Sequence, residues 1–294
     1  MKRCLSFCVA LLVLGLVPSL VRAQAQKLAV ERVPDLTYGK VGDSELKLDL
    51  AIPKEGDGPF PVVICIHGGA WRGGQRQDLA QTLDVLAGRG YVAATISYRL
   101  APAAKFPAQI EDAKAAVRWL RTNAKKYKID PDRIGAVGFS AGAHLACLLG
   151  VTDKSDGLEG NGGDAEQSSR VQAVVSFFGP TDMNNKDWSE EVETGILIPF
   201  LGASYADKPE LYRKTSSINY VKKGAPPFLF FHGTQDTLVG IRHSRSLAAK
   251  LKEVGTSAKV VEMEGEAHGW RGEKLIDTFK QTVAFFDETL KAKK

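Results

Sequence analysis

The chain has 294 residues, and its 39 lysines and arginines against 34 aspartates and glutamates give a formal net charge of +5. The basic residues are scattered along expected surface helices, which is not the pattern of a nucleic-acid-binding or other polyanion-binding protein. Its four cysteines and five histidines show no zinc-ligand spacing. We therefore expect no metal, no cofactor and no nucleic-acid partner.

Residues 1–23 have the pattern of a secretory signal peptide. Lys2 and Arg3 give a positive start, residues 9–16 form an apolar run, and a small-residue cleavage site ends at Ala23. The apolar run is shorter than the roughly 20 residues that a membrane span needs. We expect cleavage after Ala23, a secreted or periplasmic protein, and no stable membrane insertion.

Removal of this segment also removes two cysteines and three basic residues, leaving 36 basic residues against 34 acidic ones. The two remaining cysteines, Cys65 and Cys147, lie in an expected strand and an expected helix, where we interpret them as small buried apolar groups. Residues 24–294 contain no Pro- or Ser-rich linker and no sustained repeat, so we expect a single domain.

The first half of that domain predicts a hairpin followed by alternating strands and helices. The expected elements are a hairpin of residues 36–39 and 45–52, strands 61–66, 91–98 and 133–137, and helices 77–89 and 107–126. This alternation predicts an α/β fold with a mostly parallel sheet, helices on both faces, and ligand chemistry at the carboxyl ends of the strands.

Residues 138–142 read Gly-Phe-Ser-Ala-Gly and connect the strand 133–137 to an expected helix at 143–149. A serine on such a turn has a strained backbone that only small neighbours tolerate, and its hydroxyl points into open space. Ser140 is therefore the candidate nucleophile.

Two later segments interrupt the alternation. Residues 153–169 are polar and rich in glycine, and we interpret them as a flexible surface loop, with a calcium loop as the alternative. Residues 182–224 hold more apolar side chains than a connection needs, which favours a small helical lid. The alternative is a set of extra helices packed on the edge of the core.

Two further candidates follow strands in the second half. Asp236 comes after the strand 227–231, and His268 comes after the strand 258–263. The chain order Ser140, Asp236, His268, with each residue just past a strand, resembles the α/β-hydrolase superfamily over residues 37–290.

Within that superfamily the chain is most similar to carboxylesterases related to hormone-sensitive lipase and to feruloyl or acetyl-xylan esterases. The motifs that carry this resemblance are His-Gly-Gly-Ala-Trp at 67–71, Ser-Tyr-Arg-Leu-Ala-Pro at 97–102, Phe-Pro-Ala-Gln-Ile-Glu-Asp at 106–112, and the elbow at 138–142. The hormone-sensitive-lipase pattern has a third glycine where this chain has Ala70, followed by Trp71. His-Gly-Gly-x-Trp is also the pattern of kynurenine formamidases, so the bond that is cleaved stays open.

The resemblance implies a role for each candidate. His268 would accept the Ser140 proton, and Asp236 would hold the imidazole, with Asp182 as the rival acid. The backbone N–H groups of three residues would form the oxyanion hole: Gly69, Ala70 and Ala141.

The remaining candidates are structural or bind substrate. His67 is expected to organise its loop, and Arg99 and Asp112 are expected to form an ion pair behind it. The default for His144, His232 and His243 is a structural histidine. Trp71, Trp188 and Phe200 are expected to offer flat apolar surface on which a sugar or phenolic ring could stack.

The sequence thus predicts a secreted serine ester hydrolase that acts on short-chain, acetyl or hydroxycinnamoyl esters, with small-molecule or polysaccharide-linked substrates. The alternatives are an amidase of the kynurenine-formamidase kind and a catalytically inactive binding protein on the same scaffold. The oligomeric state stays open.

Overall fold

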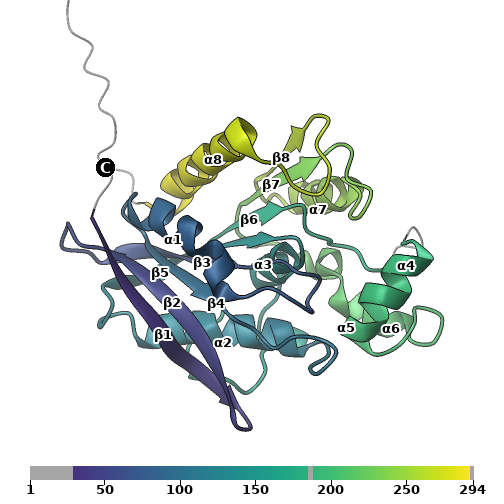
Figure 1. Cartoon of the computed structure of the whole chain (residues 1–294), viewed down its shortest axis with the longest axis horizontal. Helices are drawn as coiled ribbons and strands as arrows, with labels where there is room; N and C mark the ends of the chain where they lie inside the picture. Colours follow the sequence, from purple (N-terminus) through teal and green to yellow (C-terminus); the bar gives the residue numbers. More distant parts are fainter. Residues whose placement is uncertain (1–28, 185–187, 292–294) are drawn as a thin grey trace, which may run out of the picture.

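The computed structural model describes residues 29–184 and 188–291, and within them the sheet has eight strands in the order β1-β2-β4-β3-β5-β6-β7-β8 (Figure 1). β1 pairs with β2, and β2 with β4, in antiparallel fashion, whereas all later neighbours are parallel. The strands are β1 (Val30–Val41), β2 (Ser44–Pro53), β3 (Phe60–Ile66), β4 (Val92–Ile96), β5 (Ile129–Phe139), β6 (Ala173–Phe177), β7 (Phe228–Gly233) and β8 (Ala258–Met263). The predicted signal peptide, residues 1–23, lies outside the described residues.

Helices cover both faces of the sheet. α1 (Ala80–Ala87) and α8 (Gly272–Leu290) pack on one face, and α2 (Ala108–Thr122), α3 (Ala141–Val151) and α7 (Arg242–Glu253) pack on the other. The side chains of β3 alternate between these two layers: Val63 and Cys65 join the core under α1 and α8, while Ile64 joins the core under α2 and α3. This period of two, with both faces buried, is what a central parallel strand requires. The α/β prediction is confirmed.

Element boundaries differ from the predicted ones by a few residues. The helix expected at 77–89 begins as a 3₁₀ turn, η1 (Arg76–Leu79), and continues as α1 only to Ala87. The helix expected at 107–126 ends at Thr122, because the Asn123 side chain donates to the Trp119 carbonyl and closes the last turn. None of the described helices combines the length and the apolar character needed to cross a membrane.

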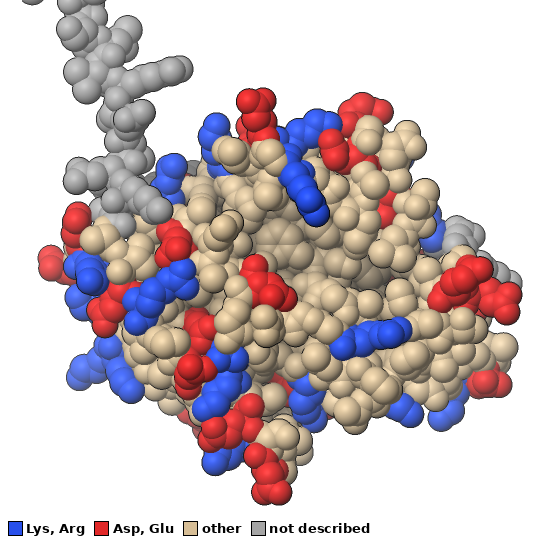
Figure 2. All heavy atoms as spheres, viewed as in Figure 1, with Lys and Arg blue, Asp and Glu red and all other residues tan. Residues whose placement is uncertain are grey.

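Charges of both signs are mixed over the face shown in Figure 2, with tan neutral surface between them. The two cysteines in the described part of the chain, Cys65 and Cys147, are buried and unpaired, as expected. Burial raises the pKa of both thiols, so neither is a candidate nucleophile.

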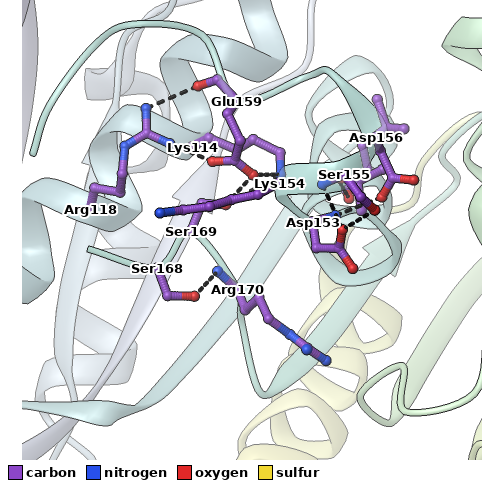
Figure 3. Close-up of polar contacts among 12 residues, drawn as sticks. Lys114, Arg118, Asp153, Lys154, Ser155, Asp156, Glu159, Ser168, Ser169 and Arg170 are labelled. Carbon is purple, nitrogen blue, oxygen red and sulfur yellow. Dashed lines mark hydrogen bonds and ion pairs between the residues drawn. The ribbon is translucent and has the colours of Figure 1, made fainter. Parts of the chain in front are cut away.

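The segment 153–169 is not simply the flexible surface loop that its composition predicts. After the short turn η2 (Lys154–Asp156), the carboxylate of Glu159 accepts hydrogen bonds from Lys114 and Arg118 of α2, both at 2.6 Å (Figure 3). These two cations have side-chain exposures of only 0% and 3%. Since buried charges need partners, Glu159 ties the loop to α2.

The calcium alternative for this loop gains no support from the same contacts. Asp156 pairs with Lys222, and Asp164 accepts from the Thr122 hydroxyl, so the acidic side chains bind separate partners. Over residues 29–184 and 188–291, no group of three or more His, Cys, Asp or Glu side chains is arranged to hold a metal ion.

The described part of the segment 182–224 forms short helices packed on the edge of the core, and a role for them as a lid stays a prediction. They are α4 (Glu190–Val192), the π-helical turn η3 (Glu193–Leu197), α5 (Ile198–Leu201), α6 (Pro209–Thr215) and η4 (Ser217–Tyr220). Figure 1 shows α4, α5 and α6 together at one end of the molecule. Phe200 and Tyr212 are almost completely buried, so these helices pack directly against the main core.

Candidate active site

Ser140 lies on a strained turn between β5 and α3, as the elbow motif predicts. Its backbone has φ +52° and ψ −117°, a conformation that residues other than glycine rarely adopt. The Ser140 N–H donates to the Phe177 carbonyl at 2.9 Å, which fixes the turn against β6. A Cβ atom on Gly138 would lie 2.1 Å from the Gly142 carbonyl oxygen, so this turn requires glycine.

Ser140, His268 and Asp236 are connected by hydrogen bonds. His268 Nε2 lies 2.9 Å from Ser140 Oγ, and His268 Nδ1 lies 2.7 Å from Asp236 Oδ2. A carboxylate only accepts, so Nδ1 carries the ring proton and Nε2 is free to accept the hydroxyl proton of Ser140. This is the protonation state that a general base needs.

Asp236 is held as a carboxylate by four donors. Its Oδ1 accepts from the N–H groups of Leu238 and Val239 at 3.0 and 2.9 Å, and its buried Oδ2 faces both His268 and His232. Burial alone would raise the pKa of Asp236, but the hydrogen bonds from His232, His268 and Val239 outweigh it and hold that pKa well below its usual range. Asp236 is therefore ionised at any pH at which the protein works.

The rival acid, Asp182, is engaged elsewhere. Its Oδ1 accepts from both the backbone and the side-chain amide of Asn184, at 3.0 and 3.1 Å. Its own N–H donates to Nδ1 of His243 at 3.3 Å. The structure brings Asp236, and not Asp182, to His268.

The loop after β3 provides the other expected part of the site. Ala70 and Ala141 line one small cavity together with Ser140. Ala141 is the first residue of α3, so no carbonyl of that helix can accept from its N–H. Gly69 precedes Ala70 in this loop. Its carbonyl oxygen accepts hydrogen bonds from the N–H groups of Arg72 and Gly73, both at 3.0 Å, which forms a tight turn. The geometry suits an oxyanion hole made by Ala141 and this loop.

His67 holds this loop from behind. Its Nδ1 lies 2.7 Å from the Gly68 carbonyl oxygen, and its ring stacks on Tyr98 at 4.4 Å. Burial lowers the pKa of His67, so it is neutral and suits the organising role. The expected ion pair is also present: Arg99 donates to Asp112 through Nε and Nη2, with the shortest distance 2.7 Å.

The expectation that Trp71 and Phe200 offer open stacking surface is wrong. Their rings stack on each other at 4.1 Å and 5°, and they are only 3% and 0% exposed. His144 packs edge-on against Trp71 at 5.2 Å and binds the Thr215 carbonyl through Nε2 at 2.8 Å. Arg72 also donates to the Gly195 carbonyl. Residues of the segment 182–224 thus contact the oxyanion loop directly.

The cavity beside Ser140 is small. Its volume is about 30 Å³, and its walls include Trp71 and the half-buried Trp188, which stacks on His243 at 5.1 Å. Both tryptophans expected to contact substrate therefore lie at the site, but they enclose a small space where an open platform was expected.

Two residues near the triad escaped the sequence reasoning. His232, read as a plain structural histidine, contacts Asp236 at 3.3 Å, and its spacing four residues before the acid was the available signal. The ring of Phe178, the residue that follows β6, lies 4.8 Å from the ring of His268. Its position at the carboxyl edge of a parallel strand could have marked it.

Comparison with known proteins places these features in a family. The family model described as BD-FAE matches residues 48–251. Esterase LipQ of Mycobacterium tuberculosis is 34% identical over 76% of this chain, and the chain spans only 53% of LipQ.

Two solved structures are similar over most of their length. A truncated carbohydrate esterase from gut microbiota has a TM-score of 0.75 and 28% identity, covering 90% of this chain and 97% of that one. Est2 of Thermogutta terrifontis, solved with propionate bound, has a TM-score of 0.72 and 27% identity, covering 90% and 94%.

Proposed function

Because the chain belongs to the BD-FAE family and has the α/β-hydrolase fold, we propose that it hydrolyses carboxylic esters through a covalent acyl-enzyme on Ser140. The observation that carries the proposal is the hydrogen-bonded series from Ser140 through His268 to Asp236. Esterases among its relatives and structural neighbours support the same activity.

Acylation follows from the contacts in the site. As the Ser140 oxygen attacks the ester carbonyl carbon, its proton passes to Nε2 of His268, and the negative charge collects on the carbonyl oxygen. The N–H groups of Ala141 and the Gly69–Ala70 loop would donate to that oxygen. When the tetrahedral intermediate collapses, the bond to the alcohol oxygen breaks, and His268 returns the proton to that oxygen.

Deacylation repeats these steps with water. His268 takes a proton from the attacking water, the acyl–Ser140 bond breaks, and the proton returns to the serine oxygen. Asp236 stays ionised throughout and stabilises the imidazolium, since its pKa is held low.

Replacement of the nucleophile tests this proposal. Ser140→Ala should fold normally and lose kcat on 4-nitrophenyl acetate by several orders of magnitude, because the oxyanion donors alone remain. A fluorophosphonate probe should label the wild type and not the variant. Retention of more than about a tenth of the wild-type kcat would contradict the assignment, and absence of labelling in the wild type would favour an inactive binding protein.

We further propose that the acyl group is short. A cavity needs roughly 10–15 Å³ to hold one water, and an apolar cavity that takes benzene measures about 150 Å³. The space of about 30 Å³ beside Ser140 therefore suits an acetyl or propionyl group. Structures of Est2 with propionate and with butyrate bound support a preference for short acyl groups.

A series of 4-nitrophenyl esters tests acyl length. kcat/KM should be highest for acetyl or propionyl and should fall steeply at octanoyl, and a maximum at octanoyl or longer would refute the short-acyl proposal. Methyl ferulate belongs in the same series, because a hydroxycinnamoyl group would have to lie outside this cavity. N-formylkynurenine tests the amidase alternative, which a clear preference for the formamide would establish.

The proposed setting is outside the cytoplasm, on acetyl or hydroxycinnamoyl esters of polysaccharides. Residues 1–23 support export, and the carbohydrate esterase from gut microbiota supports the substrate class. Expression of the whole chain, cell fractionation and amino-terminal sequencing test export. A mature protein that begins at Gln24 is expected, and an uncleaved cytoplasmic protein would refute it.

A further inference from the structure

A second and much larger hollow lies between α1 and α8. Its volume is about 610 Å³, within the range of roughly 300–1,000 Å³ that is usual for ligand pockets. Figure 2 shows this face hollowed and mostly neutral, with charged side chains around it. Two of its apolar wall residues are exposed, Val85 at 38% and Ile276 at 57%. We call this hollow the α1/α8 groove.

The wall of the groove includes direct neighbours of two catalytic residues. Phe139, which precedes Ser140, and Gly269, which follows His268, both line it. Phe178 lines it as well, and its ring packs edge-on against the His268 ring at 4.8 Å. Phe178 has φ +44°, a strained conformation of the kind that gathers at functional sites. The groove therefore lies next to the His268 side of the site, with residues adjacent to the triad in its wall.

The mechanism assigns the two halves of the ester to different sides. The carbonyl oxygen must face the N–H groups of Ala70 and Ala141, which line the cavity of about 30 Å³. The alcohol oxygen must face Nε2 of His268, because it takes its proton from there. The alcohol half of the substrate therefore extends along the His268 side, toward the α1/α8 groove.

We propose that the α1/α8 groove binds the alcohol half of the ester, and that this half is a sugar ring. The inference rests on the proposed ester hydrolysis and extends it to the leaving group. The floor is aromatic: Phe139 lies 6.4 Å from Phe178 and 6.2 Å from Phe279, and all three rings are half-buried.

The rim of the groove is polar. Asp78 and Gln81 stand on the α1 side, with Arg89 beyond that helix, and Lys280 stands on α8. A sugar ring has one apolar face for the aromatic floor and hydroxyl groups at its edge for such a rim. A plain alkyl chain could make no hydrogen bonds with those rim groups.

The test compares two half-buried phenylalanines on the same helix. Phe279→Ala removes part of the groove floor, whereas Phe285→Ala makes the same change at a separate hollow on α8. The substrates are methyl 2-O-acetyl-β-D-xylopyranoside, whose alcohol is a sugar ring, and methyl acetate, whose alcohol is too small to reach the groove. Phenyl acetate provides an aryl alcohol.

Phe279→Ala should lower kcat/KM for the acetyl xyloside about tenfold, mainly through KM, and should leave methyl acetate within twofold. Phe285→Ala should leave both within twofold. If Phe279→Ala folds poorly, Phe279→Leu keeps the apolar volume and should give the same pattern. Equal losses on both acetates, or no loss on the xyloside, would overturn the inference. A loss confined to phenyl acetate would overturn the sugar assignment.

Other occupants have their own signatures. A wild-type dimer that Ile276→Arg converts to a monomer, measured by light scattering, would assign the groove to a second copy of the chain and overturn the inference. A wild type that cleaves none of the three acetates would refute the ester hydrolysis itself. That result differs from intact methyl acetate cleavage without a groove effect, which would refute the groove assignment alone.

Discussion

Phe200 should matter for catalysis although it is fully buried and belongs to a different segment from the catalytic residues. Ala70 and Trp71 have φ +51° and +56°, and each such non-glycine residue costs about 1–3 kcal/mol. The Trp71 ring stacks on the Phe200 ring at 4.1 Å, and this contact helps to hold the loop in that conformation. Replacing a buried phenylalanine with alanine lowers the free energy of unfolding by about 3–5 kcal/mol. That loss is comparable to the energy of the two strained backbone conformations at Ala70 and Trp71.

We expect Phe200→Ala to release the loop and move the Ala70 N–H. Loss of one oxyanion donor lowers kcat by about 10²–10³, so kcat on 4-nitrophenyl acetate should fall within that range. The matched control is Phe286→Ala, another fully buried phenylalanine, which packs against β5 far from the loop.

The two variants should lose similar stability in urea unfolding, and only Phe200→Ala should lose kcat. Equal kcat values in the two folded variants would refute the reasoning, because the stack would then contribute packing energy and nothing to the oxyanion hole. A stability loss in Phe200→Ala far above that of the control would also count against it, since the loop would then unfold with the core.

Three other outcomes follow from the contacts. Asp236→Asn should lower kcat by about 10⁴, as in other triads, while Asp182→Asn should be mild; kinetics in the reverse order would transfer the acid role. Glu159→Gln should lower the free energy of unfolding in urea by about 3–5 kcal/mol, because it leaves two buried cations without a carboxylate partner. The exposed Glu166→Gln should lower it little, and equal losses would contradict the role of Glu159 in holding the loop to α2. Burial lowers the pKa of His144 to about 4, so between pH 6.5 and 4 the unfolded chain binds a proton that the folded one does not. The free energy of unfolding should therefore decrease as the pH is lowered through this range, by up to about 1.4 kcal/mol per pH unit. Burial also lowers the pKa of His243 and of His67, so His144→Gln should reduce that slope without abolishing it. An unchanged urea midpoint profile would exclude His144 as a contributor.

The parts of the site that were predictable from the sequence depend on local backbone geometry or on strand order. The elbow at Ser140 needs glycines at fixed offsets, and parallel strands bring their carboxyl ends to one edge, which puts Asp236 and His268 beside it. The loop at 153–169 was misread for the opposite reason. Glu159 looks solvated in a polar stretch, and its partner Lys114 lies 45 residues away on a helix whose buried face the composition does not reveal.

The same limit explains why the aromatic residues were misassigned. Trp71 and Phe200 looked like substrate contacts because they flank the oxyanion loop and a supposed lid, but a stack between distant segments is decided by packing. Phe139 entered the sequence analysis only as part of the elbow motif and Phe178 not at all, although the carboxyl edge of a parallel sheet is where substrate lies. Aromatic residues that stack on each other support the machinery, and those left half-exposed beside His268 are free to meet the substrate. Specificity for the alcohol should therefore change with substitutions in the α1/α8 groove, while substitutions at Trp71 should change kcat for every ester alike.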